Sequence, residues 1–115
     1  MNIIYEIDTS FLNFNDSSQY FSILIKLILS FSDPYDSNLL EKTLKLMKTI
    51  LLKAYVRATE PLLFGELSSK VKEDESTRKL LEWLGERGGM VATIGRDILC
   101  ICENAKGYLN RVQNN

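Results

Sequence analysis

Basic side chains on one predicted helix, residues 38–59, are the strongest candidates for binding chemistry in this sequence. At 3.6 residues per turn, four of them fall within one arc of about 120°: Lys42, Lys45, Lys53 and Arg57. Lys48 lies outside that arc, nearer the apolar edge of the helix. Positive charges at helical spacing can follow a phosphate backbone, which requires charge but no base-specific geometry. These five residues are the candidate nucleic-acid-binding set. An ordinary solvated face and a surface for an acidic protein partner remain the alternatives.

The residues available for catalysis or metal binding are few. The chain contains no His, which excludes Ser-His-Asp triads, Cys-His dyads and His-ligated metals. Cys100 and Cys102 are separated by one residue, a spacing that disfavours a disulfide between them, and we expect reduced thiols packed as small apolar groups. The acidic run at 73–75 suits a solvated helix start. We predict no catalytic residue, no metal, no cofactor and no small-molecule substrate, and therefore no enzyme.

Composition and length predict one soluble domain over residues 1–115. The chain has 14 Lys and Arg against 15 Asp and Glu, a net charge of -1, with 45% hydrophobic residues. This balance argues against a protein that coats nucleic acid through charge alone. The most apolar stretch, residues 20–31, contains Lys26 and is shorter than the roughly 20 residues of a membrane span. The N-terminus has no basic region of a signal peptide, so we expect a cytoplasmic protein without membrane contact.

The hydrophobic pattern predicts an all-α fold, a compact bundle of four to five helices with a short extended N-terminal arm at residues 3–7. Asp16 or Ser17 is the expected N-cap of the first helix, which is apolar nearly all round and is expected to be buried on several sides. On the second helix, the predicted inward face comprises Leu40, Leu44, Met47, Leu51, Ala54 and Tyr55. The expected helices cover residues 17–31, 38–59, 62–72, 73–87 and 90–113.

The C-terminal segment allows two interpretations. As a helix over 90–113 it forms an apolar stripe with alternating spacings of three and four residues: Val91, Ile94, Ile98, Ile101, Ala105, Tyr108 and Val112. As a hairpin, strands 90–94 and 98–102 would flank a turn at 95–97. We favour the helix because it accounts for the whole segment. Gly95 and Gly107 are its weak points, each costing about 1 kcal/mol relative to Ala.

The chain resembles the small helical subunits of type I CRISPR Cascade surveillance complexes, particularly the type I-A small subunit. The similarity lies in the overall size, in a first helical hairpin of the form FSILIKLILSF…LLEKTLKLMKTILLKAYVRA, and in the final helix GMVATIGRDILCICENAKGYLNRV. The resemblance implies a non-catalytic subunit of an antiviral defence complex. Such a subunit would pack against other protein subunits, including copies of itself, and would hold DNA or RNA by its phosphates.

A winged-helix transcriptional regulator is the alternative function. Residues 65–89 resemble the second and third helices of that family, with a recognition helix at about 75–87 and a wing at 90–102. The helix would present Ser76, Thr77, Arg78 and Lys79 to the major groove. A helical segment 90–102 would exclude this alternative. A protein-only adaptor is the third interpretation.

Overall fold

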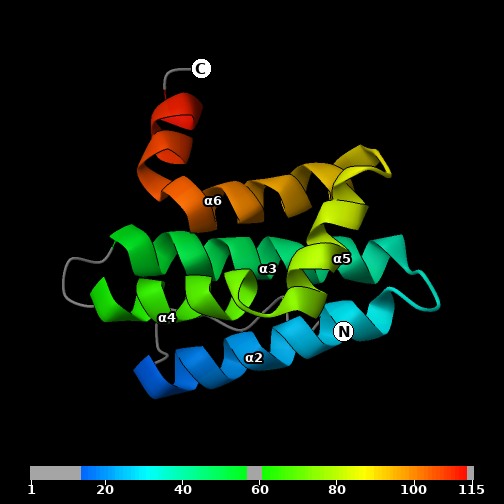
Figure 1. Ribbon diagram of the computed structural model, residues 1–115, viewed down its shortest axis with the longest axis horizontal. Coiled ribbons are helices and arrows are strands. Elements are labelled where there is room, and N and C mark those ends of the chain that lie inside the picture. Colours follow the sequence, from blue (N-terminus) through cyan, green and yellow to red (C-terminus); the bar gives the residue numbers. More distant parts are fainter. Residues whose placement is uncertain (1–13, 57–60, 114–115) are drawn as a thin grey trace.

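The computed structural model describes residues 14–56 and 61–113, and this part of the chain is an all-α bundle (Figure 1). Its helices are α2 (Phe14–Phe31), α3 (Ser37–Val56), α4 (Pro61–Lys72), α5 (Glu75–Gly85) and α6 (Gly89–Gln113). The predicted fold class is therefore confirmed. The expected N-terminal arm at residues 3–7 lies outside the described residues. None of the described helices combines the length and the apolar character needed to cross a membrane.

Helix α3 occupies the centre of the bundle, with α6 on one side and α2 and α4 on the others (Figure 1). The predicted inward residues from Leu40 to Ala54 are indeed buried, and Thr43, Leu46 and Ile50 are buried as well. The buried arc is thus wider than a single stripe because three helices pack around α3. The prediction for Tyr55 is wrong. Its ring is more than one-third exposed and packs edge-on against Phe64 of α4, with 5.2 Å between ring centroids.

Helix α2 begins three residues earlier than the sequence pattern predicts. Asp16 lies in the first turn of the helix and Ser17 is a buried residue inside it, so neither is the N-cap. The helix dipole favours a carboxylate both at the N-cap and in the first turn. The position of Asp16 therefore could not fix where α2 begins. The expected burial on several sides is only partly seen, because Phe21 and Leu24 are fully buried whereas Ile23 is half exposed.

Residues 90–102 are helical throughout, so the hairpin interpretation and the wing that depends on it are wrong. Helix α5 ends at Gly85, and Gly88 and Gly89 then take positive φ values of 83° and 80°, which turn the chain into α6. Gly95 lies where α6 crosses α5. A Cβ atom there would stand 3.5 Å from the Leu81 carbonyl oxygen. That distance is an ordinary van der Waals contact, so Gly95 packs against α5 inside a continuous helix and does not mark a turn.

Helix α6 bends at Asn104, where the backbone leaves helical geometry with φ -156° and ψ 77°. The Asn104 side-chain oxygen accepts a hydrogen bond from the Gly107 N–H at 3.0 Å, the arrangement of an N-cap at the start of a new helical segment. The bend removes the end of the predicted apolar stripe from the core. Tyr108 stays buried, but Val112 is 53% exposed, because the last turns no longer follow the axis of residues 89–103.

Gly107 and Asn104 should be thermodynamically coupled. A Cβ at position 107 would lie 2.5 Å from Asn104 Nδ2, so Gly107→Ala should displace the capping side chain. In the wild-type background, Gly107→Ala should gain about 1 kcal/mol of helix propensity and lose about 1 kcal/mol of capping, so the free energy of unfolding should stay nearly unchanged. In an Asn104→Ala background the same substitution should stabilise the protein by about 0.5–1 kcal/mol. Urea unfolding of the four proteins measures this coupling, and equal effects of Gly107→Ala in both backgrounds would contradict it.

Candidate nucleic-acid interface

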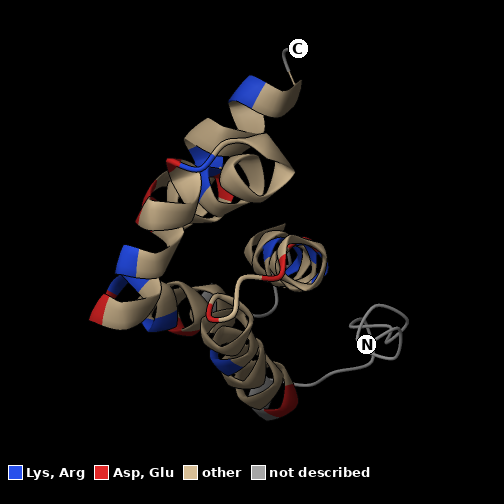
Figure 2. Ribbon diagram, turned by 90° about the vertical axis from the view of Figure 1, so that its right-hand side faces the viewer, with Lys and Arg blue, Asp and Glu red and all other residues tan. Residues whose placement is uncertain are grey.

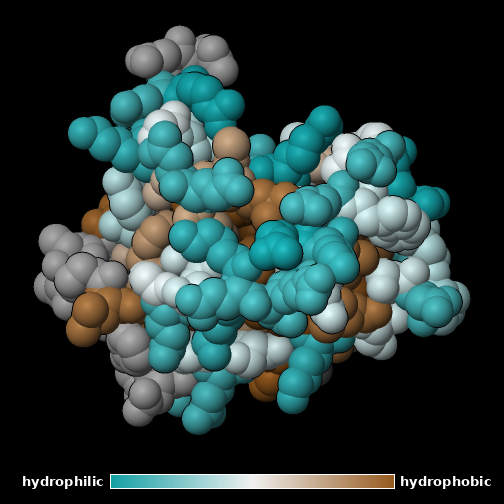
Figure 3. Space-filling model, in the orientation of Figure 1, coloured by the Kyte–Doolittle hydropathy of each residue, from teal (hydrophilic) through white to brown (hydrophobic). Residues whose placement is uncertain are grey.

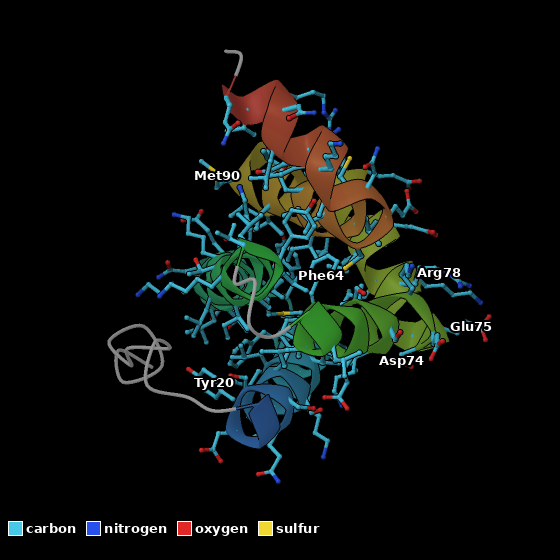
Figure 4. All side chains as sticks on the ribbon, turned by 90° about the vertical axis from the view of Figure 1, so that its left-hand side faces the viewer. Tyr20, Phe64, Asp74, Glu75, Arg78 and Met90 are labelled. Carbon is cyan, nitrogen blue, oxygen red and sulfur yellow. The ribbon has the colours of Figure 1, made fainter. Side chains whose placement is uncertain are left out.

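The predicted basic residues of α3 occupy different environments. Lys53 is exposed, Lys42 and Lys45 are half-buried, and Arg57 lies outside the described residues. Viewed nearly end-on, α3 has one side that no other described helix covers, and blue Lys positions recur along its ribbon (Figure 2). The same side of α3 carries nitrogen-tipped side chains that project away from the bundle (Figure 4). The structure therefore keeps the helical face of Lys42, Lys45 and Lys53 open along the described part of α3.

Lys45 is only partly available as a binding group. Its Nζ lies 3.0 Å from Glu41 Oε2, one helical turn earlier, with both side chains more than one-third exposed. Exposed i,i+4 pairs of this kind are worth only about 0.3–0.5 kcal/mol. An incoming phosphate could therefore displace Glu41 at small cost.

Lys48 has a structural role between α3 and α6. Its Nζ lies 2.9 Å from Asp97 Oδ2 and 5.4 Å from the centroid of the Tyr108 ring. Partial burial by itself would lower the pKa of Lys48, but its contacts with Tyr108 and Asp97 outweigh burial and raise that pKa. The ammonium is therefore held in its charged form by groups of its own chain. It is the least suited of the four described lysines to bind an external phosphate.

A groove of about 400 Å³ adjoins this basic face between α3 and α6. Its walls combine two ammonium groups, two threonine hydroxyls, one carboxylate and apolar side chains: Lys45, Lys48, Thr49, Leu52, Met90, Thr93, Ile94 and Asp97. Both hydroxyls donate to carbonyl groups of their own helices, Thr49 to Lys45 and Thr93 to Gly89, so their oxygens can still accept. Sequence analysis missed Thr49, although it lies within the same arc as the lysines.

Helix α5 presents little of the recognition surface that a winged-helix protein would need. Thr77 is fully buried and donates to Asp74 Oδ2 at 2.5 Å. Lys79 pairs with Glu75 at 2.8 Å, and Arg78 donates to the Lys72 carbonyl oxygen at 3.3 Å. Figure 4 shows Asp74, Glu75 and Arg78 together at the start of α5. The acidic residues there would repel a phosphate backbone.

The two cysteines are free thiols, as predicted. Burial raises the pKa of Cys102 to about 12. Cys100 is half-buried, with Arg111 Nη2 3.0 Å from its Sγ. Within residues 14–56 and 61–113, no three His, Cys, Asp or Glu side chains converge as a metal-binding group would.

Comparisons of this chain with known protein families, with curated proteins and with solved structures give no match.

The Lys48–Asp97 pair should contribute more to stability than the Lys45–Glu41 pair, because it is less exposed and joins two helices. Double-mutant cycles with Lys48→Met and Asp97→Asn should give a coupling of about 1 kcal/mol. The control cycle with Lys45→Met and Glu41→Gln should give about 0.3–0.5 kcal/mol. Because the pKa of Lys48 is raised on folding, its stabilisation is complete below its ordinary pKa of 10.5 and is lost as the pH rises further. Equal couplings in the two cycles would contradict the structural role of Lys48.

Cys102 should resist alkylation in the folded protein. A pKa raised from 9.0 to about 12 lowers the thiolate fraction about 1,000-fold at pH 8, and the thiolate is the reactive form. Peptide mass spectrometry after iodoacetamide treatment should find Cys100 modified first, and both cysteines modified in guanidinium. Equal rates at the two positions in the folded protein would contradict the burial of Cys102.

Proposed function

We propose that this protein is a non-catalytic subunit of a ribonucleoprotein complex that contacts the nucleic-acid backbone through the open face of α3. The observation that carries the proposal is that Lys42, Lys45 and Lys53 share one face of α3 and keep at least part of their side chains exposed. Nitrogen-tipped side chains project from the uncovered side of this helix (Figure 4). Lys42 and Lys53 are eleven residues apart, about 16 Å along a helix axis at 1.5 Å per residue. That length can contact several successive phosphates, for which regular charge is sufficient.

The all-helical fold is compatible with a role as a subunit of a larger complex. The protein would contact neighbouring proteins, including copies of itself, through its other surfaces while α3 faces the nucleic acid. This arrangement fits the resemblance to the small subunits of type I CRISPR complexes, whose expected all-helical fold agrees with the fold seen here. The contact is to phosphates, so it fits DNA and RNA alike.

The winged-helix alternative is not proposed. Its wing would occupy residues 90–102, which are part of α6, and Thr77 of its recognition helix is buried. The groove between α3 and α6 instead extends the basic face with the hydroxyl groups of Thr49 and Thr93, which can accept hydrogen bonds from sugar hydroxyls.

Charge reversal on α3 tests the proposal. The Lys42→Glu/Lys53→Glu variant should bind a fluorescein-labelled single-stranded 20-mer at least about tenfold more weakly than the wild type at 50 mM salt. The slope of log affinity against log salt should also fall by about 1.4, since each phosphate contact contributes about 0.7. Fluorescence anisotropy on the full chain measures both quantities, with DNA and RNA as parallel probes.

The matched control is Lys26→Glu/Lys79→Glu, which changes the net charge equally at exposed positions of α2 and α5. Its affinity should stay within about twofold of the wild type if the contact is local to α3. Equal weakening by the two double variants would show that only net charge matters and would overturn the α3 interface. Circular dichroism and thermal melting of both variants confirm that the helices are retained.

A further inference from the structure

An aromatic–arginine cluster lies between the turn joining α2 to α3 and the C-terminal end of α5. The rings of Tyr35 and Trp83 meet edge to face, with centroids 6.1 Å apart and planes at 84°. The Arg87 guanidinium lies over both rings, 4.3 Å from the Tyr35 centroid and 4.6 Å from the Trp83 centroid. Tyr35 is nevertheless 38% exposed and Trp83 41% exposed, so the two aromatic rings and their bound cation remain at the surface.

Backbone hydrogen bonds hold the cluster in place before any partner arrives. The Asp36 N–H donates to the Phe31 carbonyl at 2.9 Å, and the Asp36 side chain accepts from the Leu39 N–H at 3.1 Å, which together anchor the turn of Tyr35. The Arg87 N–H donates to the Leu84 carbonyl at 3.1 Å. A surface already ordered in the free protein loses little conformational entropy on binding. Tyr, Trp and Arg are also the residue types that contribute most binding energy at protein interfaces.

The surroundings of the cluster are acidic. The segments 33–36 and 82–87 contain four carboxylates and one base, a local charge of -3: Asp33, Asp36, Glu82, Glu86 and Arg87. The remaining residues carry 13 Lys and Arg against 11 Asp and Glu. All four carboxylate residues are exposed, and within the described residues no Lys or Arg is ion-paired with Asp33, Glu82 or Glu86. This rim repels phosphates and attracts cations.

The remaining exposed apolar side chains offer no comparable combination. They are dispersed over several helices, and on the face shown in Figure 3 the apolar surface is interrupted by hydrophilic side chains. The groove between α3 and α6 belongs to the interface already described.

We propose that Tyr35, Trp83 and the carboxylates around them form a docking surface for an Arg- or Lys-containing segment of a partner protein. Arg87 shows that the two rings accept a cation, and the acidic rim supplies the complementary charge. A guanidinium from the partner would lie against the same rings beside or in place of Arg87. This inference goes beyond the proposed function, because it concerns a protein contact on a surface whose charge is opposite to that of the α3 face.

Trp83 is the only tryptophan of the chain, so its fluorescence reports directly on the cluster. The probe is a ten-residue peptide of alternating Arg and Gly, titrated into the full-length protein at 150 mM salt. A peptide with citrulline in place of Arg keeps the shape without the charge, and a peptide with Glu in place of Arg reverses the charge. We expect saturable Trp83 quenching with the Arg peptide and none with the other two.

Two variants keep the fluorescent reporter and test the two parts of the surface separately. Glu82→Gln/Glu86→Gln should weaken the Arg peptide about tenfold by removing rim charge. Tyr35→Leu should weaken it about three- to tenfold by removing one ring. The control Glu66→Gln/Glu103→Gln removes the same charge at exposed positions of α4 and α6 and should leave the affinity within about twofold.

Three results would overturn the docking surface: equal weakening by the control and by Glu82→Gln/Glu86→Gln, equal binding of the citrulline peptide, or no quenching up to about 1 mM Arg peptide. Trp83 quenching by a single-stranded 20-mer, with none by the Arg peptide, would assign the cluster to nucleic acid and would also overturn the proposal. Because the peptide titration contains no nucleic acid, its failure is distinguishable from failure of the α3 interface.

Discussion

The burial of α3 against three other helices is the constraint on which the rest of the structure depends. Leu40, Leu44, Met47 and Leu51 are fully buried between α2, α4 and α6, and each such side chain stabilises the fold by about 1.5–3 kcal/mol relative to exposure. With so much of its circumference occupied, α3 can expose only one narrow side. Lys42, Lys45 and Lys53 therefore share the remaining side, where their charges stay solvated. Lys48 lies nearer the core and pairs with Asp97.

The contact between α3 and α6 links this constraint to the bend at Asn104. Residues 89–103 supply the long apolar contact with α3, and Asp97 pairs with Lys48 at its edge. Beyond the bend, Tyr108 still contacts Lys48, whereas Val112 turns towards solvent. Lys48 thus connects α3 to both segments of α6, and the ion pair and the capped bend together define how the last helix lies on the core.

The two proposed surfaces have opposite charge, so the net charge of -1 is the sum of a basic region and an acidic region. A near-neutral chain is not uniformly neutral: the α3 face is basic, and the turn and helix end around Trp83 carry a local charge of -3. A protein that binds phosphates with one surface and a basic protein segment with the other, as proposed above, needs this separation. The acidic groups near Trp83 would weaken any nucleic-acid contact there, and the lysines of α3 would weaken contact with a basic partner.

The helices and most of the core follow from the sequence alone, because the spacing of Leu40, Leu44, Met47 and Leu51 and the breaks at Pro34, Pro61 and Gly88-Gly89 are local signals. The lysine face of α3 follows from helical geometry in the same way. Only the tertiary structure could decide that Lys48 pairs with Asp97, 49 residues later, and that Tyr35, Trp83 and Arg87 meet. It also revealed that Gly95 packs against α5 and that Asn104 is an internal cap. Most of these features depend on contacts between residues distant in the chain, and the Asn104 cap depends on a side chain that replaces a helix-backbone hydrogen bond. The periodicity of apolar residues in the sequence carries no information about either.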